Sequence, residues 1–246
     1  MTEHSGLSEV YRLLGEPQAG GVLVVADHAS SRVPDDIALG IAPDLLREHI
    51  AVDIGVAGVA ERMVRPGTAA FLANVSRLVC DFNRDPDAPG IFPETSDGYP
   101  IPGNVLSAAA RAARLERFFD PYHTALAAML EANPPALILS LHSFTPRLAS
   151  DPAQTRPWQV GVLYNEDDRA ARIAIPLLEA EGLVVGDQHP YSGKVLNATM
   201  NRHAEALGRP YLGIEIRQDQ IGTDEGEALW AERLSAIAAT VTLQLV

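Results

Sequence analysis

Three apolar segments of the sequence end in side chains that can bind a metal or transfer protons. Residues 136–142 (ALILSLH) end in a histidine, residues 22–28 (VLVVADH) end in Asp-His, and residues 210–217 (PYLGIEIR) end in an acid and a base. Such apolar runs are typical of buried strands in a parallel sheet, whose carboxyl ends open into the ligand crevice. We therefore predict that these polar side chains meet at one edge of a sheet.

The side chains at these strand ends are the types that a hydrolytic zinc site uses. His28 and His142 offer neutral nitrogen ligands, and Glu215 offers a general base beside a metal-bound water. A single histidine at a strand end is more often a hydrogen-bonded structural residue than a ligand. Two histidines at equivalent positions of the strand pattern, far apart in the sequence, favour the metal site.

The composition restricts the class of protein. The chain has 246 residues with 47% hydrophobic content, and no linker or internal repeat divides it. We therefore expect a single domain over residues 1–246, with a flexible leader over 1–18. The net charge of -13 argues against a nucleic-acid partner. It does not argue against a small acidic substrate, which one arginine can hold.

Cysteine content and hydropathy indicate the compartment. Cys80 is the one cysteine, so a disulfide framework is excluded and a cytoplasmic location is expected. We find neither a charged-then-apolar leader nor an apolar run long enough to span a bilayer. We therefore expect neither secretion nor a membrane partner.

Strand and helix patterns alternate along the chain. The expected strands lie at 21–26, 69–75, 78–82, 136–141, 159–164, 183–185 and 211–216. The expected helices lie at 43–64, 105–131, 167–181, 195–207 and 224–243. Alternation of this kind predicts an α/β fold with a mostly parallel sheet and helices on both faces.

A set of short motifs, taken together, resembles the N-formylglutamate amidohydrolase family. The motifs are 27–30 (DHAS), 49–55 (HIAVDIG), 76–77 (SR), 81–86 (DFNRDP), 141–143 (LHS), 190–193 (PYSG) and 215–219 (EIRQD). The family is similar to the zinc exopeptidases of phosphorylase/hydrolase-like fold, which include zinc carboxypeptidases and peptidoglycan amidases. The resemblance implies a three-layer α/β/α sandwich and one catalytic zinc ion.

The resemblance implies His28, Asp53 and His142 as the zinc ligands. Zinc carboxypeptidases place a glutamate three residues after the first histidine, whereas this chain has Ser31 there, so the acidic ligand must come from elsewhere. Asp53 is the best match on chemical grounds. Asp27 is the alternative, either as a ligand or as a partner that orients an imidazole through its second ring nitrogen.

The resemblance also implies that Glu215 is the general base, since carboxypeptidases carry their catalytic glutamate on the corresponding late strand. Burial at the end of a strand would raise its pKa, while a nearby zinc ion would favour the ionised form. The alternative is an ion pair with Arg217, which lies two residues further on the same face of the strand.

Asn83 and Arg84 resemble the adjacent Asn-Arg pair that holds the terminal carboxylate in carboxypeptidases. A guanidinium offers two parallel donors to a carboxylate, and the neighbouring amide adds another. A surface ion pair between Arg84 and Asp85 is the competing interpretation. Arg77 and Arg217 are the alternatives for a second substrate carboxylate, because an N-acyl glutamate carries two.

Three other residues are candidates for the site. His49 lies four residues before Asp53 and is either a metal ligand or a partner of that carboxylate. His203 is a candidate for stabilising a developing oxyanion. Gly193 ends a turn-like segment that we expect to line the substrate pocket.

These observations predict a cytoplasmic zinc amidohydrolase that cleaves a small N-acyl amino acid similar to N-formylglutamate, with metal-activated water. A peptidase or peptidoglycan-type amidase of the same fold is one alternative. A binding protein for acidic metabolites, without catalysis, is another, although Glu215 favours chemistry because a binder needs no base there. The sequence leaves the oligomeric state undecided.

Overall fold

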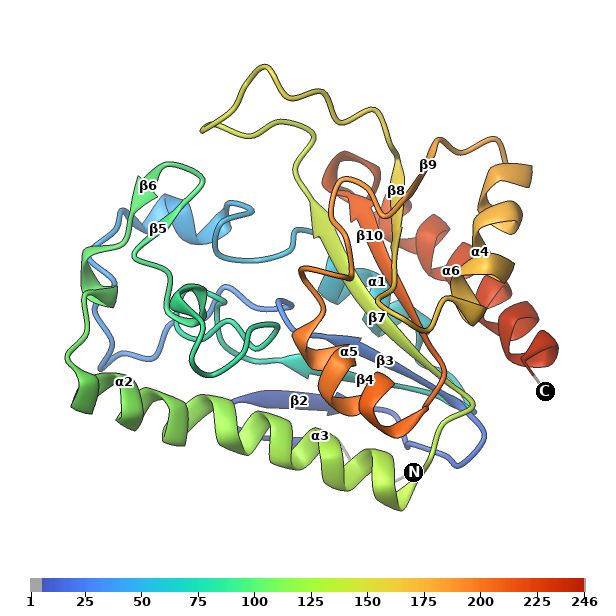
Figure 1. Cartoon of the computed structure of the whole chain (residues 1–246), viewed down its shortest axis with the longest axis horizontal. Coiled ribbons are helices and arrows are strands. Elements are labelled where there is room, and N and C mark those ends of the chain that lie inside the picture. Colours follow the sequence, from blue (N-terminus) through green and yellow to red (C-terminus); the bar gives the residue numbers. More distant parts are fainter. Residues whose placement is uncertain (1–5, 246) are drawn as a thin grey trace.

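An eight-stranded sheet forms the centre of the computed structural model, which describes residues 6–245 (Figure 1). The strands lie in the order β1-β2-β4-β3-β7-β10-β8-β9. They span Gly6–Leu7 (β1), Tyr11–Leu14 (β2), Val22–Ala26 (β3), Thr68–Ala73 (β4), Leu137–Phe144 (β7), Val160–Leu163 (β8), Val185–Asp187 (β9) and Tyr211–Arg217 (β10). Strands β4, β3, β7 and β10 run parallel, whereas β2 and β8 run antiparallel to β4 and β10. The predicted α/β class with a mostly parallel sheet is therefore confirmed.

The central strands are apolar on both faces because helices cover both faces of the sheet. Every residue of β7 is buried, and β3, β4 and β10 are buried except at one end residue each. This double burial explains why the sequence shows continuous apolar runs rather than an alternation of apolar and polar residues.

The helices form the two outer layers. They span Val56–Met63 (α1), Ala108–Arg114 (α2), Asp120–Ala132 (α3), Arg169–Ala180 (α4), Ala198–His203 (α5) and Asp224–Gln244 (α6). Helices α1, α4 and α6 lie on one face of the sheet, and α2, α3 and α5 lie on the other (Figure 1). A π-helical turn joins α2 to α3 and produces the long helix that the sequence predicted. Within residues 6–245, no helix combines the length and the apolar character needed to cross a bilayer.

The helix expected over 43–64 is interrupted. Residues Pro43–Arg47 form a 3-10 turn (η1), and the helix itself begins only after Gly55, which has a left-handed φ of 80°. A Cβ on Gly55 would lie 2.1 Å from the carbonyl oxygen of Ile221. The close approach and the positive φ both require glycine. Because of this interruption, Asp53 precedes α1, and its carboxylate faces the carboxyl edge of the sheet.

The strand expected over 78–82 is a series of turns around Ser76. The main-chain N–H groups of Val79 and Cys80 donate to the carbonyl oxygen of Ser76, and that of Leu78 donates to its hydroxyl. The apolar side chains of this segment are nevertheless fully buried. The prediction of a strand here is wrong, because this segment is buried without pairing with a neighbouring strand. An apolar sequence pattern reports burial and does not report strand pairing.

The leader expected over 1–18 contains two strands in its described part. Strand β2 pairs with β4 in antiparallel register, and β1 pairs with β2 at the edge of the sheet. Residues 1–5 lie outside the described part of the chain.

We expect Gly55→Ala to lower the free energy of unfolding by about 3 kcal/mol or more, because strain at a positive φ is added to a steric overlap with Ile221. Gly67 is the matched control, since it has a φ of 86° and open space around its Cα. Gly67→Ala should therefore cost only about 1–2 kcal/mol. Urea unfolding of both variants measures the difference, and equal losses would contradict the steric argument.

Candidate metal centre and active site

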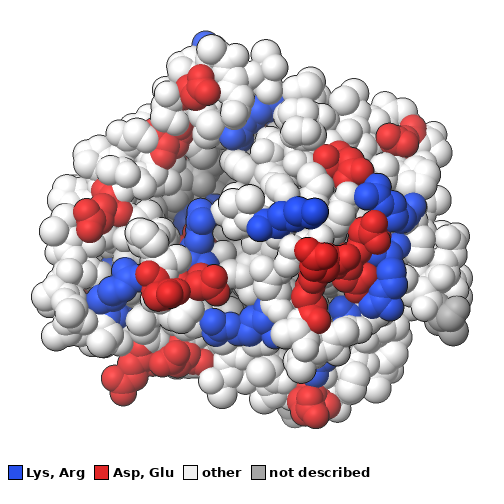
Figure 2. Space-filling model, in the orientation of Figure 1, with Lys and Arg blue, Asp and Glu red and all other residues white. Residues whose placement is uncertain are grey.

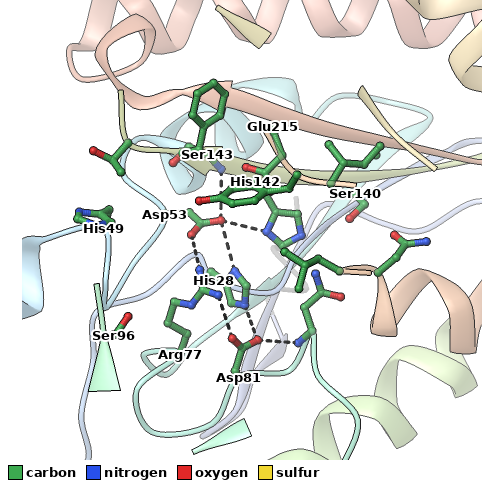
Figure 3. A pocket seen from close by; sticks show the side chains of 18 of the residues that line it. His28, His49, Asp53, Arg77, Asp81, Ser96, Ser140, His142, Ser143 and Glu215 are labelled. Atoms are coloured by element: carbon green, nitrogen blue, oxygen red, sulfur yellow. Dashed lines mark hydrogen bonds and ion pairs between the residues drawn. The ribbon is translucent and has the colours of Figure 1, made fainter. Parts of the chain in front are cut away.

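A cavity of about 280 Å³ lies at the carboxyl ends of β3, β7 and β10. His28 follows β3, and His142 and Glu215 lie in the second halves of β7 and β10, opposite each other in the parallel register. All three side chains line the cavity (Figure 3). Strands that run parallel thus bring together residues that are far apart in the sequence.

His28, Asp53 and His142 form a cluster whose possible ligand atoms all lie within 4.8 Å of one another. The Nδ1 atom of His142 lies 3.0 Å from Oδ2 of Asp53, and the Nδ1 atom of His28 lies 3.4 Å from the same oxygen. All three residues are buried. Two imidazole nitrogens and one carboxylate therefore converge, as Figure 3 shows.

A second carboxylate faces the outer nitrogen of each imidazole. The Nε2 atom of His28 lies 2.8 Å from Oδ1 of Asp81, and the Nε2 atom of His142 lies 3.7 Å from Oδ2 of Asp27. Asp27 is itself held by the hydroxyl of Tyr122, which donates to its Oδ1 at 2.7 Å. The hydrogen bond to Asp81 holds a proton on Nε2 of His28 and directs the Nδ1 lone pair of this ring inward, an arrangement typical of metal-binding histidines. Asp27 is too far from His142 for a hydrogen bond, so Nε2 of His142 has no hydrogen-bond partner among the described residues.

Arg77 bridges the two carboxylates next to His28. Its Nη1 donates to Asp53 at 3.3 Å and its Nη2 donates to Asp81 at 2.9 Å. Burial alone would raise the pKa of both carboxyl groups, but Arg77 and the imidazole of His28 hold each pKa well below its usual range. Both carboxylates therefore stay ionised, and each terminal nitrogen of Arg77 contacts a carboxylate of this network.

The imidazoles hold protons tightly in this environment. Burial alone would lower their pKa values, but Asp81 and Asp53 raise the pKa of His28 to about 9. The hydrogen bond that the His142 ring donates to Asp53 likewise raises the pKa of His142. A metal ion needs the neutral imidazole, so binding of a cation here would release protons.

The donor set fits a zinc ion. Zinc prefers imidazole nitrogen together with carboxylate oxygen, and three protein ligands are usual where zinc is catalytic. The Nδ1 atom of His28 is buried and has no hydrogen-bond partner among the described residues. An unpartnered nitrogen of this kind is costly to bury unless something binds it.

Glu215 is buried beside this cluster, and no arginine, lysine or histidine among the described residues forms an ion pair with it. Its Oε2 has no hydrogen-bond partner within the described chain. Burial raises its pKa to about 7, although the positive charge of His142 opposes this rise. Arg217 does not pair with it, because the Arg217 guanidinium donates to Asp219 and to the carbonyl oxygens of 156–158.

Asn83 and Arg84 both line the cavity. The side-chain oxygen of Asn83 accepts a hydrogen bond from the main chain of Thr199 at 3.1 Å, which leaves the amide nitrogen available. Arg84 is partly exposed, and its nearest carboxylate atom in the described structure is Oδ2 of Asp81, 3.8 Å from its Nε. Its Asp85 ion pair, the competing interpretation from the sequence, is absent from residues 6–245.

Three candidates from the sequence lie outside the cavity, and a fourth lines it away from the His28 cluster. His203 is buried against His123, with 2.9 Å between their ring nitrogens, and does not line the cavity. Gly193 packs against the main chain of Tyr164, and Arg217 faces away from the cavity. His49 lines the outer part of the cavity but pairs with Asp97 at 2.9 Å, so it is separate from the His28 cluster.

Asp81 is the functional neighbour that the sequence reasoning missed. It lies in one of the motifs, but the pattern assigns it no role. Asp81 lies four residues after Arg77, and oppositely charged residues at this spacing often form an ion pair where the backbone is helical or turn-like. This spacing could have indicated the ion pair from the sequence. On the face of the molecule that Figure 2 draws, acidic and basic side chains are intermixed.

Comparisons with known proteins agree with this geometry. A family model described as N-formylglutamate amidohydrolase matches residues 20–222. A gene product of Agrobacterium tumefaciens has a similar structure, with a TM-score of 0.89, 28% identity, and coverage of 97% of this chain and 96% of that chain. The N-formylglutamate amidohydrolase of Ralstonia eutropha has a TM-score of 0.76 at 21% identity, covering 96% and 98% of the two chains. No curated protein matches the sequence.

We expect Glu215→Gln to stabilise the metal-free protein relative to the native chain as the pH rises. The pKa of Glu215 is about 7 in the folded protein, against an ordinary value of 4.5, so the unfolded chain releases this proton first. The native chain therefore loses stability between these two values, and the glutamine variant does not. From about pH 5 to about pH 8 the difference in unfolding free energy should grow by about 2 kcal/mol. Urea unfolding in chelator measures it, and a constant difference would contradict the burial argument.

Proposed function

We propose that this chain, which belongs to the N-formylglutamate amidohydrolase family, is a zinc-dependent amidohydrolase of small N-acyl amino acids such as N-formylglutamate. Membership of the family makes it a hydrolase that acts on amides. The observation that carries the proposal is the convergence of His28, Asp53 and His142 at one point, with the buried Glu215 beside them. Since the strands of one sheet support this whole site, we also propose that the chain is a single domain.

In this proposal His28, Asp53 and His142 hold the zinc ion. Asp81 fixes the orientation of the His28 imidazole through its Nε2 atom, and Asp53 holds the His142 imidazole at its Nδ1 atom. When bound, zinc would polarise the amide carbonyl of the substrate and lower the pKa of a water molecule.

Glu215 acts as the general base. Its pKa of about 7 is close to neutral pH, where a group can both accept and return a proton efficiently. It takes a proton from the attacking water and delivers it to the nitrogen of the leaving amine. Its unpartnered Oε2 is the atom available for this transfer.

Arg84 and Asn83 bind the substrate carboxylate. The alternatives that the sequence left open are both engaged, Arg77 by Asp53 and Asp81, and Arg217 by Asp219. Arg84 is therefore the lining guanidinium whose terminal nitrogens remain available within the described residues. Its planar pair of donors suits a carboxylate.

Metal binding and turnover should separate in three variants. The native chain should bind one zinc ion, and His142→Ala should lose it together with all activity, because one of three ligands is gone. His49→Ala is the matched control and should keep the metal, since His49 pairs with Asp97 instead. Glu215→Gln should keep the metal but lose roughly 10²–10⁴-fold in kcat. Metal analysis and assays on N-formyl, N-acetyl and dipeptide substrates measure these effects, and zinc retained by His142→Ala would contradict the ligand set.

Arg84→Lys should lower kcat/KM for an N-acyl amino acid by roughly tenfold to a hundredfold, because a point charge replaces a two-donor fork. If Arg84 also orients the amide of the substrate, the substitution should both raise KM and lower kcat. Arg217→Lys is the control and should have little effect. On a substrate whose carboxylate is amidated, the kcat/KM of Arg84→Lys should be close to that of the native chain. Equal losses on the acid and the amide would show that Arg84 does not bind the carboxylate.

A further inference from the structure

A buried arginine next to the cavity, Arg156, has no carboxylate partner within residues 6–245. It is 6% exposed, and its donors go to neutral oxygens. Its Nε donates to the side chain of Gln154 at 2.9 Å, and its Nη1 donates to the carbonyl oxygen of Thr145 at 3.2 Å and to the hydroxyl of Tyr191 at 3.0 Å. A guanidinium that is removed from water without an anion is costly. Its position therefore points to a use at the group that it contacts.

Arg156 determines the hydrogen-bonding role of Tyr191. A guanidinium has donors only, so the phenol oxygen accepts, and the hydrogen of the phenol remains for another acceptor. No oxygen in the described part of the chain accepts it. The guanidinium carbon lies 5.1 Å from the centroid of the Tyr191 ring and holds the ring by a cation–π contact. Tyr191 lines the same cavity as His142 and Glu215.

The phenol keeps its proton at neutral pH. Burial and the negative charge of Glu215 raise the pKa of Tyr191 above its ordinary value, and Arg156 only partly offsets this rise. Tyr191 is therefore a neutral O–H donor at the wall of the cavity.

Two other donor residues at this wall are already engaged. Both terminal nitrogens of Arg77 bind carboxylates, and the hydroxyl of Ser143 donates to the carbonyl oxygen of Ile54 at 2.9 Å. Arg84 is assigned above to the substrate carboxylate. An oxygen that becomes negative during amide hydrolysis needs a donor that is already in place.

We propose that Tyr191 is a catalytic residue that donates its O–H to the amide oxygen of the substrate, and that Arg156 is the residue that positions and polarises it. This inference rests on the proposed amide hydrolysis. When water adds, the carbonyl double bond opens and its electron pair moves to the oxygen, where the hydrogen bond strengthens. The pair returns when the carbon–nitrogen bond breaks, and the phenol keeps its proton throughout.

Tyr191→Phe removes the hydroxyl alone and tests this role. We expect kcat to fall by roughly 10²–10³-fold, with KM changed by less than about threefold and metal content unchanged. Arg156→Met should lower kcat in the same direction, and Arg156→Lys should recover part of it, because the lysine still carries a donor. Thermal unfolding of each variant shows that the fold is kept.

A second measurement separates a catalytic role from a structural one. A tetrahedral phosphonamidate analogue of the N-acyl amino acid mimics the transition state, so its affinity should fall in Tyr191→Phe by the same factor as kcat/KM. The affinity for the product amino acid should not change. If the analogue still binds as tightly as to the native chain, the proposal is overturned, whatever the activity of the variant.

Tyr164 provides a matched control. It too lies under an arginine, Arg172, whose guanidinium carbon is 5.1 Å from the ring and whose Nη2 donates to the hydroxyl. Its hydrogen is already donated to Asp187 at 2.7 Å, and it does not line this cavity. Tyr164→Phe should leave kcat and KM within about twofold of the native values.

The outcomes separate this inference from the proposed function. If the native chain is active and Tyr191→Phe keeps the native kcat, or changes KM alone, the role of Tyr191 is overturned. The proposed amidohydrolase function is then unaffected. A native chain that binds zinc but hydrolyses no N-acyl amino acid overturns the proposed function and this inference with it.

Discussion

The site depends on one buried network of charges, in which Arg77 lies between the carboxylates of Asp53 and Asp81 and the imidazole of His28 lies beside both. Each of these groups would be costly to bury alone, and removing one partner would leave an uncompensated charge. Together they satisfy one another and keep the carboxylates ionised. The same contacts orient the imidazole, so the stability of the network and the readiness of the metal site have one physical origin.

Glu215 shows what happens to a carboxylate just outside this network. It shares the cavity with Asp53, yet burial raises its pKa to about 7 while that of Asp53 is held low. The difference comes from partners, since Arg77 and two imidazoles face Asp53 and one oxygen of Glu215 has none among the described residues. Two carboxyl groups with opposite shifts can take different parts in one reaction, the first as a permanent anion and the second as an exchanger of protons.

Three arginines around the cavity also differ in the partners that their guanidinium groups contact. Arg77 is held by two carboxylates and serves the network, whereas Arg84 contacts one carboxylate only loosely and is available to a ligand. Arg156 is buried among neutral oxygens and directs its charge to Tyr191. Residue type alone therefore does not assign a role to an arginine here, because each guanidinium takes its role from the acceptors that the fold brings to it.

The sequence by itself determined the architecture and most of the cluster. Continuous apolar runs mark strands that are buried on both faces, and the ends of parallel strands must meet, so the pattern alone places His28, His142 and Glu215 together. Only the tertiary structure decided which partners the polar groups find. The contact between Asp53 and His142 joins residues 89 positions apart, and it depends on where Gly55 interrupts a helix. Such contacts follow from the packing of distant segments, which no local pattern encodes.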